Sequence, residues 1–460
     1  MSKLAEGGSN KVFRLIMDNY SVVIARIPYP ISGSSCLSIA SEVATMDFIP
    51  VPKVLSWSGK ADNPVESEYI LTEEAVGRPL NEVWYDMDLR DQLKIVENII
   101  SIENKFLSLS FTRYGNLYFA KEAFSGCEKA AVANDVSISQ RMEVETRFVI
   151  GPVSNKSFWN KERASLATDR GPWKSHTDYL KAIARREIAW ISRHATTQTQ
   201  TDSQSKPKTQ NSPQAHIDLY RRFLSISDHL LPDNQDLNRA TLWHWDIHAP
   251  NLFVNDENEI TGLIDWQDVF VGPLFFEARR PKFIAYNGEI MLELPENFKS
   301  IEDEDEKARI RDQVKRSILI YAYELGTSNT NPVLSEILNT PHGRTRTQTV
   351  LYSTNTWDDD IIPFRQCLIR IARHWNEING DTTCPITFTD NELKTHYEEG
   401  EGWNEEADFW DALDHIVFRD GWTSNETYEQ AVDLFTELRK MGMQSLTGAE
   451  QSEFEKETRH

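Results

Sequence analysis

One stretch, running from Leu242 to Gln267, constrains the fold of this chain more than any other. It reads LWHWDIHAPNLFV, then NDEN, then EITGLIDWQ. Two short apolar runs flank an Asn- and Asp-rich segment that favours a tight turn, so the stretch predicts a β-hairpin. Because a hairpin brings its two ends together, we expect Asp246, Asn251 and Asp265 to lie close to one another.

These three side chains are of the kinds that phosphoryl transfer from ATP requires. Asp246 would orient the acceptor hydroxyl and take its proton, while Asn251 and Asp265 would hold Mg²⁺ on the phosphates. The ordinary alternative is an exposed hairpin that merely carries polar residues at its ends. The apolar strand and the Ile-Asp-Trp run that follow the Asp and Asn pair favour the catalytic interpretation.

The N-terminal region supplies the other half of such a site, in the expected order along the chain. Gly7, Gly8 and Ser9 precede a predicted strand, as a loop that covers phosphates would. Arg26 ends a Val-Ile-Ala-Arg run where protein kinases carry Val-Ala-Ile-Lys, and Glu42 on the next predicted helix would be its ion-pair partner. Each piece alone has an ordinary explanation, namely a turn, the end of a strand and a solvated helix residue.

Hydrophobic periodicity divides the chain into a small strand-rich part and a larger helical part. Residues 1–72 contain short strand patterns around one helix, whereas residues 73–445 carry long amphipathic helices. Residues 195–215 contain no large apolar side chain and predict a flexible surface loop. Residues 446–460 predict a frayed polar tail. These patterns together favour an α+β fold.

Charge and composition exclude several classes of function. Lys and Arg number 49 against 71 Asp and Glu, so the net charge is −22. Phosphate backbones and anionic lipids would repel such a chain, which disfavours nucleic acid and membrane surfaces as partners. The 4 cysteines form no C-x-x-C pair, which argues against a thiolate zinc site. No apolar run is long enough to span a membrane, and we expect no presequence in this chain.

Several motifs along the chain resemble a known family. They read EGGSNKVF, VIARIP, SEVATMDF, IPVPKV, LWHWDIHAPNLFV, ITGLIDWQ and PLFFEARRP. The sequence is similar to the fungal "altered inheritance of mitochondria" phosphotransferase-like proteins, in the aminoglycoside phosphotransferase and choline kinase branch of the protein-kinase-like fold. The resemblance implies two lobes: a β-rich nucleotide lobe at residues 1–72, and a mainly helical lobe at residues 73–445 that contains the hairpin of residues 242–267.

The resemblance also implies roles for individual residues. Asp246 would be the catalytic base, with Asn251 and Asp265 as magnesium ligands. Arg26 and Glu42 would form the ion pair on the phosphate side, below the glycine loop. The hinge beside adenine would consist of Glu73, Glu74 and Ala75.

By the same resemblance, the chain would be an ATP- and Mg²⁺-dependent phosphotransferase that acts on a hydroxyl of a small molecule. Cationic acceptors are candidates, because acidic residues could line their pocket, and four residues are considered for this: Glu145, Glu162, Asp268 and Glu277. The family resemblance implies a mitochondrial location, with the cytoplasm as the alternative.

Two departures from the family pattern leave alternatives open. The chain starts close to its glycine loop, so we expect the first strand of the nucleotide lobe to be missing, and Pro50 shortens the helix that carries Glu42. A catalytically impaired pseudokinase or nucleotide-binding partner in mitochondria is therefore one alternative. A metal-dependent hydrolase is another, because His244, Asp246 and His248 could offer three ligands from alternate positions.

Overall fold

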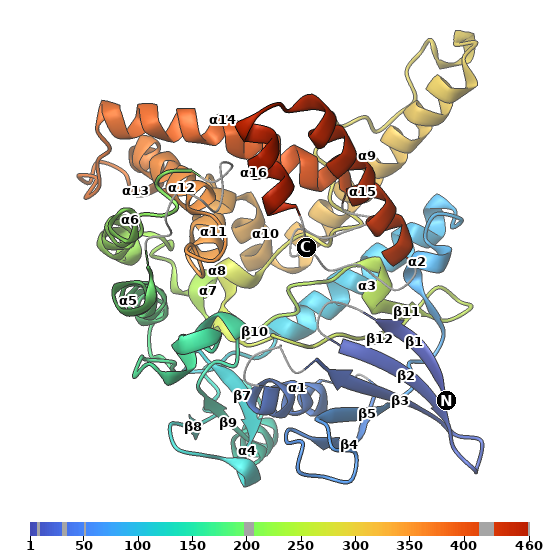
Figure 1. Cartoon of the computed structure of the whole chain (residues 1–460). Coiled ribbons are helices and arrows are strands. Elements are labelled where there is room, and N and C mark those ends of the chain that lie inside the picture. The colour runs from blue at the N-terminus through green and yellow to red at the C-terminus, as the bar shows by residue number, and fades with distance from the viewer. Residues whose placement is uncertain (7–9, 30–34, 50–51, 197–206, 414–426, 459–460) are drawn as a thin grey trace.

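The computed structural model describes residues 1–6, 10–29, 35–49, 52–196, 207–413 and 427–458. A five-stranded sheet and one helix form the N-terminal part of the molecule, and most of the rest is helical (Figure 1). This arrangement confirms the predicted fold class, an α+β fold with a small β-rich lobe and a large, mainly helical lobe.

The N-terminal sheet is antiparallel, with the strand order β1-β2-β3-β5-β4. Its strands are β1 (Ser2–Glu6), β2 (Asn10–Ile16), β3 (Val22–Pro28), β4 (Val54–Ser58) and β5 (Tyr69–Glu73). Strands β2 and β3 form a hairpin. Its turn is closed by the hydrogen bond from the Tyr20 amide to the Met17 carbonyl (2.8 Å), and Tyr20 has a φ of +66°.

The expectation of a missing first strand is wrong. Residues Ser2–Glu6 form β1, which pairs with β2 from Ser2 opposite Arg14 to Glu6 opposite Lys11. Ser-Lys-Leu-Ala-Glu contains no β-branched residue, so local propensity does not reveal this strand, and the open edge of β2 provides its hydrogen-bond partners. The argument for an impaired nucleotide lobe that rested on this absence therefore loses its basis.

One helix, α1 (Ser35–Phe48), lies between the N-terminal sheet and the rest of the molecule (Figure 1). Ile39 and Val43 on α1 pack with Ile70 of β5 in a small core. The helix also contacts β7 (Asn116–Phe119) of the larger lobe. It ends before Pro50, as expected, and Glu42 lies in its middle.

Strands in the larger lobe form three small sheets. Their orders are β7-β9-β8, β12-β11-β6 and β10-β13. The strands are β6 (Arg78–Pro79), β8 (Glu128–Lys129), β9 (Phe148–Gly151), β10 (Ala240–Leu242), β11 (Leu252–Val254), β12 (Ile260–Leu263) and β13 (Val271–Pro273). The pairing of β11 with β12 confirms the predicted hairpin.

Helices supply most of the larger lobe and its main core. Those of the first half are α2 (Leu80–Val83), α3 (Leu89–Leu107), α4 (Ile138–Arg147), α5 (His176–His194), α6 (Pro213–Ile226), α7 (Gln235–Asn238) and α8 (Leu274–Glu277). Those of the second half are α9 (Glu304–Thr330), α10 (Pro332–Asn339), α11 (Gly343–Tyr352), α12 (Ile361–Arg373), α13 (Trp375–Asn379), α14 (Asp390–Leu413), α15 (Tyr428–Ser445) and α16 (Ala449–Glu457). Short 3₁₀ turns include η2 (Lys156–Phe158), η3 (Lys161–Ser165) and η5 (Ala249–Asn251).

The prediction of a flexible loop at residues 195–215 is wrong for its last part. Residues 197–206 lie outside the described residues, but Gln210 is buried. Its amide donates to the carbonyls of Thr356 (2.9 Å) and Trp357 (3.0 Å), and its oxygen accepts from the Ile361 amide (2.8 Å). Composition misses this packing, because a polar side chain can be buried when its hydrogen bonds are satisfied.

The expectation of a frayed tail is wrong as well. Residues Ala449–Glu457 form α16, which packs against α15. The ring of Phe454 lies so close to Gly442 of α15 that a Cβ there would come within 2.4 Å of it. Gln451 donates to the Met443 carbonyl (2.7 Å). A single aromatic side chain against a glycine thus holds a segment whose composition is almost entirely polar.

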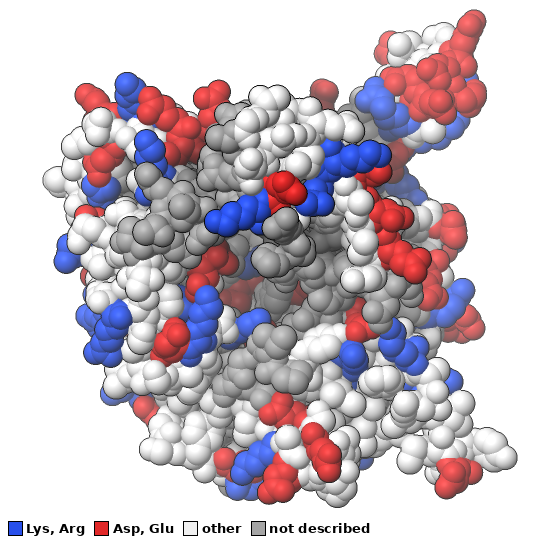
Figure 2. All heavy atoms as spheres, viewed as in Figure 1, with Lys and Arg blue, Asp and Glu red and all other residues white. Residues whose placement is uncertain are grey.

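The long helix α9 begins with a dense group of acidic side chains. Asp303 caps it by accepting from the amides of Asp305 (2.9 Å) and Glu306 (3.4 Å). Figure 2 shows acidic side chains gathered over this projecting end of the molecule. Carboxylates at a helix N-terminus are stabilised by the helix dipole. Within the described residues, no helix is both long and apolar enough to cross a membrane.

Candidate active site

Arg26 and Glu42 form a buried ion pair in the N-terminal lobe. Arg26 lies on β3 and donates through Nη2 to the Glu42 carboxylate on α1. Exposed fractions of the two side chains are 17% and 4%. Burial acts to lower the pKa of Arg26, but the Glu42 carboxylate outweighs it and the pKa is raised. The predicted partners therefore meet, and the pairing also holds α1 against the sheet.

The hairpin of β11 and β12 brings Asp246, Asn251 and Asp265 together through its backbone. Asn251 Nδ2 donates to the Asp246 carbonyl (3.2 Å), and the Ile264 amide donates to the Asn251 carbonyl (2.9 Å). His244 Nε2 lies 3.0 Å from the Ile264 carbonyl and fixes the same segment from behind. Asn251 thus connects the loop that carries Asp246 with the strand end that carries Asp265.

The two lobes meet at Asp265. Its Oδ1 lies 3.8 Å from Nη1 of Arg26. Asp265 and Asp268 both have left-handed backbone conformations, with φ of +64° and +59°, which is uncommon for residues other than glycine. Gln267, between them, accepts a hydrogen bond from Asn10 Nδ2 (2.7 Å) at the start of β2. This sharp turn holds both aspartates beside the Arg26 and Glu42 pair.

Negative charge is concentrated at this meeting point. Burial, then repulsion by Asp265, raises the pKa of Asp268. Burial also raises the pKa of Glu42, and both aspartates add to that effect. The three carboxylates therefore repel one another around Arg26. A site in which three carboxylates surround a single arginine favours the binding of a cation.

Asp246 has a cationic neighbour that sequence reasoning missed. Lys282 Nζ lies 2.7 Å from Asp246 Oδ1, and His248 Nδ1 lies 3.4 Å from Oδ2. The Lys282 amide also donates to the Ile247 carbonyl (3.3 Å), so the segment after Pro281 contacts the loop that carries Asp246. Nothing in the local pattern links a lysine to an aspartate 36 residues earlier, so only the tertiary structure reveals this pair.

The structure describes only some of the residues that are predicted to contact the nucleotide. Gly7, Gly8 and Ser9 lie outside the described residues. Glu73 ends β5, and the Glu74 carboxylate accepts two hydrogen bonds from the guanidinium of Arg14, at 2.6 and 3.1 Å. Ala75 faces Gly262 of β12. The segment of residues 73–75 therefore connects the sheet to the hairpin of β11 and β12, where β6 pairs with β11.

The four acidic candidates for an acceptor pocket do not gather at one place. Glu145 pairs with Lys129 (2.7 Å), and Glu162 accepts from the indole of Trp190 (3.1 Å). Burial raises the pKa of Glu277 to about 7. Asp268 is the one of the four whose pKa responds to Asp265 and Arg26. It is therefore the acidic candidate that belongs to the site.

The hydrolase alternative finds no support in the geometry. His244 is buried, and burial lowers its pKa, so its neutral ring donates Nε2–H to the Ile264 carbonyl. His248 Nδ1 instead lies 3.1 Å from the Asp246 carbonyl. Among the described residues, His244, Asp246 and His248 do not form a group whose ligand atoms converge on one point.

A cavity of about 580 Å³ lies behind the hairpin, between the end of α1, α3, α4 and β12. Its lining includes Phe48, Phe106, Phe148, Gly262 and Trp266. None of the predicted site residues lines it. The candidate site is therefore the polar meeting point of the lobes and is separate from this cavity.

Comparisons with known proteins agree with the family that the motifs suggest. A sequence profile described as "Phosphotransferase enzyme family" matches residues 158–279, which include the hairpin of β11 and β12. The chain is 30% identical over 485 residues to a subtelomeric hrmA-associated cluster protein of Aspergillus fumigatus, and the match covers 95% of this chain and 92% of that protein.

A second relative carries the name that the motifs suggest. "Altered inheritance of mitochondria protein 9, mitochondrial" of Yarrowia lipolytica is 24% identical over 460 residues, covering 94% of this chain and 76% of that protein. Among solved structures, the gentamicin complex of APH(2″)-IIa has a TM-score of 0.36 and 12% sequence identity, and covers 80% of this chain and 90% of that one.

Proposed function

The chain belongs to the fungal "altered inheritance of mitochondria" phosphotransferase-like family, and from this premise we propose that it transfers a phosphoryl group from ATP, with Mg²⁺, to a hydroxyl of a small molecule. The observation that carries the proposal is the meeting of the two lobes at Asp265. There, an arginine and a glutamate from the small lobe face an aspartate from the catalytic hairpin.

The donor set fits a magnesium nucleotide. Asn251 and Asp265 offer an amide and a carboxylate oxygen, which are the ligands that Mg²⁺ prefers. Repulsion acts among the carboxylates of Glu42, Asp265 and Asp268 around Arg26. A divalent cation would offset this repulsion. When bound, Mg²⁺ and ATP supply an activated phosphoryl group with its charge neutralised. Arg26, held in place by Glu42, would contact the phosphates.

Asp246 is the proposed proton acceptor. Its side chain is 19% exposed, so it can reach an acceptor bound from the solvent side. A carboxylate there orients the acceptor hydroxyl and takes its proton as the new phosphate ester forms. Lys282 and His248 hold that carboxylate in position. The net charge of −22 favours acceptors that carry a positive charge.

Replacing Asp265 by Ala should weaken the binding of Mg·ATP itself, because the proposal makes Asp265 a ligand of the metal that bridges the phosphates. We expect an affinity loss of at least about tenfold, comparable to the loss of one ligand contact. The measurement is a calorimetric titration with ATP at fixed Mg²⁺, repeated with ATP alone. The difference between the two titrations should shrink in the variant.

Asp256→Ala is the matched control for this experiment. Asp256 lies in the turn of the same hairpin, its side chain is 94% exposed, and its partner Arg78 is 3.7 Å away. Its loss should leave Mg·ATP affinity unchanged. If Asp265→Ala binds Mg·ATP as tightly as Asp256→Ala, then the hairpin does not hold the metal and the proposed function is wrong.

A mitochondrial location is the second part of the proposal. It is supported by the name of the Yarrowia relative, which includes "mitochondrial". The full-length protein tagged with a fluorescent protein at its C-terminus should co-localise with a matrix marker in a fungal cell. Diffuse cytoplasmic fluorescence from a tagged protein of full size would contradict the location and would leave the phosphotransfer proposal standing.

A further inference from the structure

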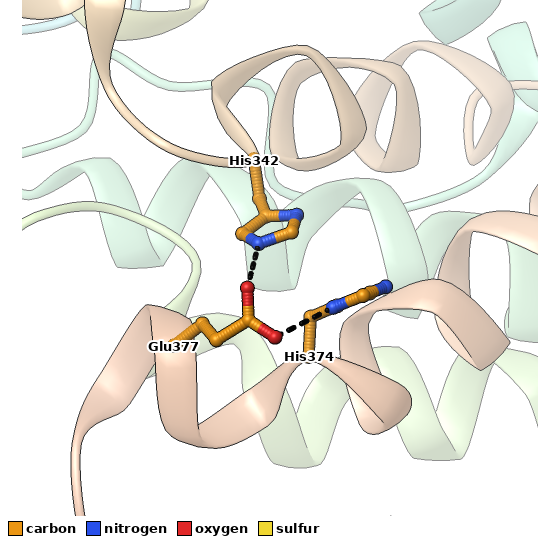
Figure 3. Close-up of side chains that lie close together, drawn as sticks. All are labelled: His342, His374 and Glu377. Carbon is orange, nitrogen blue, oxygen red and sulfur yellow. Dashed lines mark hydrogen bonds and ion pairs between the residues drawn. The ribbon is translucent and has the colours of Figure 1, made fainter.

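Three side chains that commonly bind metals converge on helices that contribute nothing to the candidate active site. His342 Nε2 lies 2.7 Å from one oxygen of Glu377, and His374 Nδ1 lies 2.9 Å from the other (Figure 3). One ligand atom from each residue lies within 4.8 Å of the other two. Across the described ranges of the chain, no other group of three His, Cys, Asp or Glu side chains meets this condition.

The fold places the two histidines at helix boundaries, where their positions are well defined. His342 precedes the first residue of α11 and has a φ of +56°. Few residues other than glycine adopt this conformation, although histidine is one of those enriched in it. The Gly343 amide closes the turn on the Thr340 carbonyl (3.0 Å). The backbone thereby directs the His342 ring toward α13, as Figure 3 shows.

His374 lies between α12 and α13. Its carbonyl accepts from the Glu377 and Ile378 amides, both at 3.1 Å, which starts α13. Glu377 follows three residues later, and this spacing puts both side chains on one face of the helix. The neighbouring Trp375 is buried and anchors this short helix in the core. Two separate segments of the chain therefore present their side chains to a common point.

The two imidazole rings stack, with 4.5 Å between their centroids and an angle of 26° between their planes. Each ring directs one nitrogen at the same carboxylate. Hydrogen bonds from His374 and then His342 lower the pKa of Glu377, which keeps its carboxylate ionised. Solvent can reach all three side chains, whose exposed fractions are 23%, 35% and 62% for His342, His374 and Glu377.

We propose that His342, His374 and Glu377 form a binding site for one divalent transition-metal ion of the zinc class. Two imidazole nitrogens and a carboxylate are a three-ligand set that zinc accepts in proteins, with water in the fourth position. Mg²⁺ prefers oxygen ligands and a nearly octahedral shell, so the site discriminates against the metal of the proposed phosphotransfer. A bound ion would connect the start of α11 to the junction of α12 and α13.

Metal binding needs a lone pair on each nitrogen that faces the carboxylate. Without metal, these nitrogens carry the protons that are donated to Glu377. On binding, each of these nitrogens releases its proton to solvent, and a neutral ring takes up a proton on its other nitrogen, so that the freed lone pair faces the ion. The ordinary alternative is a partly exposed ion-pair cluster without a metal. Such clusters contribute little to stability and have no selectivity among divalent ions.

The test uses the full-length chain, stripped of metal with a chelator and dialysed. Titration with Zn²⁺ should show one equivalent bound, and Co²⁺ should produce the visible absorption of a four-coordinate site. Two variants should each weaken Zn²⁺ binding by about 10- to 100-fold and remove the Co²⁺ absorption. They are His342→Asn, in which Asn tolerates the left-handed backbone, and His374→Gln, which keeps a polar side chain of similar length.

His194→Gln is the control, because His194 is an exposed histidine at the end of α5. It should bind Zn²⁺ as the wild type does, and circular dichroism should show that all three variants are folded. Three results would overturn the proposal: no stoichiometric Zn²⁺ binding by the wild type, unchanged binding in both cluster variants, or displacement of Zn²⁺ by millimolar Mg²⁺. None of them bears on the phosphotransfer proposal.

Discussion

Asp246→Asn is expected to lower phosphoryl transfer by about two to four orders of magnitude while leaving Mg·ATP affinity within a few fold of the wild type. The amide keeps the shape of the side chain but cannot take the proton of the acceptor hydroxyl. The metal ligands proposed at Asn251 and Asp265 remain, so nucleotide binding should persist. This separation of turnover from binding distinguishes Asp246 from Asp265, although both belong to one hairpin.

Turnover can be measured before the acceptor is identified. Labelled ATP incubated with a metabolite extract reveals transfer to any hydroxyl, and hydrolysis of ATP in the absence of extract reveals transfer to water. Calorimetry on the same preparations gives the affinity for Mg·ATP. A wild-type chain that binds Mg·ATP but transfers phosphate to nothing would contradict the proposed catalytic function.

Lys282→Gln is the control that separates proton transfer from the loss of an ion pair. Asp246→Asn also removes the pairing with Lys282, whose side chain is 67% exposed. Exposed ion pairs contribute about 0–1 kcal/mol, so Lys282→Gln should change turnover far less than Asp246→Asn. Equal losses in the two variants would mean that Asp246 acts only by positioning the loop and does not accept the proton.

Glu187→Gln is expected to lower the free energy of unfolding by about 3–5 kcal/mol, because it removes a charge shared by two buried guanidinium groups, of which only Arg163 keeps another carboxylate partner, Asp358 at 3.1 Å. Glu187 on α5 is fully buried, as are Arg163 and Arg186. Its oxygens accept from Nε and Nη2 of Arg163 and from Nε of Arg186, all at 2.8 Å. Burial penalises a charged group strongly when its partner is lost.

The surroundings of this network make rearrangement costly. The guanidinium of Arg163 lies 4.1 Å from the centre of the Trp190 ring, and that of Arg186 lies 4.1 Å from the centre of the Phe158 ring. Arg186 also donates to the Thr354 carbonyl (2.6 Å). The arginines therefore join η2, η3 and α5 to the segment after α11, and they cannot turn to solvent without opening these contacts.

Urea unfolding followed by tryptophan fluorescence measures the change. Glu143→Gln is the matched control, since Glu143 is 62% exposed and pairs with Arg147 one turn along α4 (2.8 Å). Such a pair contributes about 0.3–0.5 kcal/mol. If Glu187→Gln lowers the free energy of unfolding by no more than Glu143→Gln does, then the network does not contribute the expected stability.

Patterns that depend on neighbouring residues could be predicted from the sequence. The hairpin of β11 and β12 follows from two apolar runs around a turn, and α3 follows from its apolar period. Backbone geometry over a few residues decides both of these elements. The pairing of Arg26 with Glu42 is instead expected from the kinase-like order of the motifs along the chain.

Helix faces were predicted less well. On α9, Tyr321 and Leu325 continue the apolar period of the helix, but both are 49% exposed. Tyr323 is buried instead, and its hydroxyl donates to Glu103 of α3 at 3.0 and 3.1 Å. Burial raises the pKa of Glu103 to about 8. The apolar period of a helix cannot show which face a neighbour will cover, since the packing of α3 against α9 decides that.

By itself, the sequence determined the fold class and the local hairpin that presents Asp246, Asn251 and Asp265. Only the tertiary structure decided that Lys282 pairs with Asp246, that Arg26 reaches Asp265, and that His342 and His374 meet at Glu377. The physical reason is the range of the forces involved. Backbone propensities act between neighbours in sequence, whereas ion pairs and metal ligation depend on distances in space, which exist only after the core has packed.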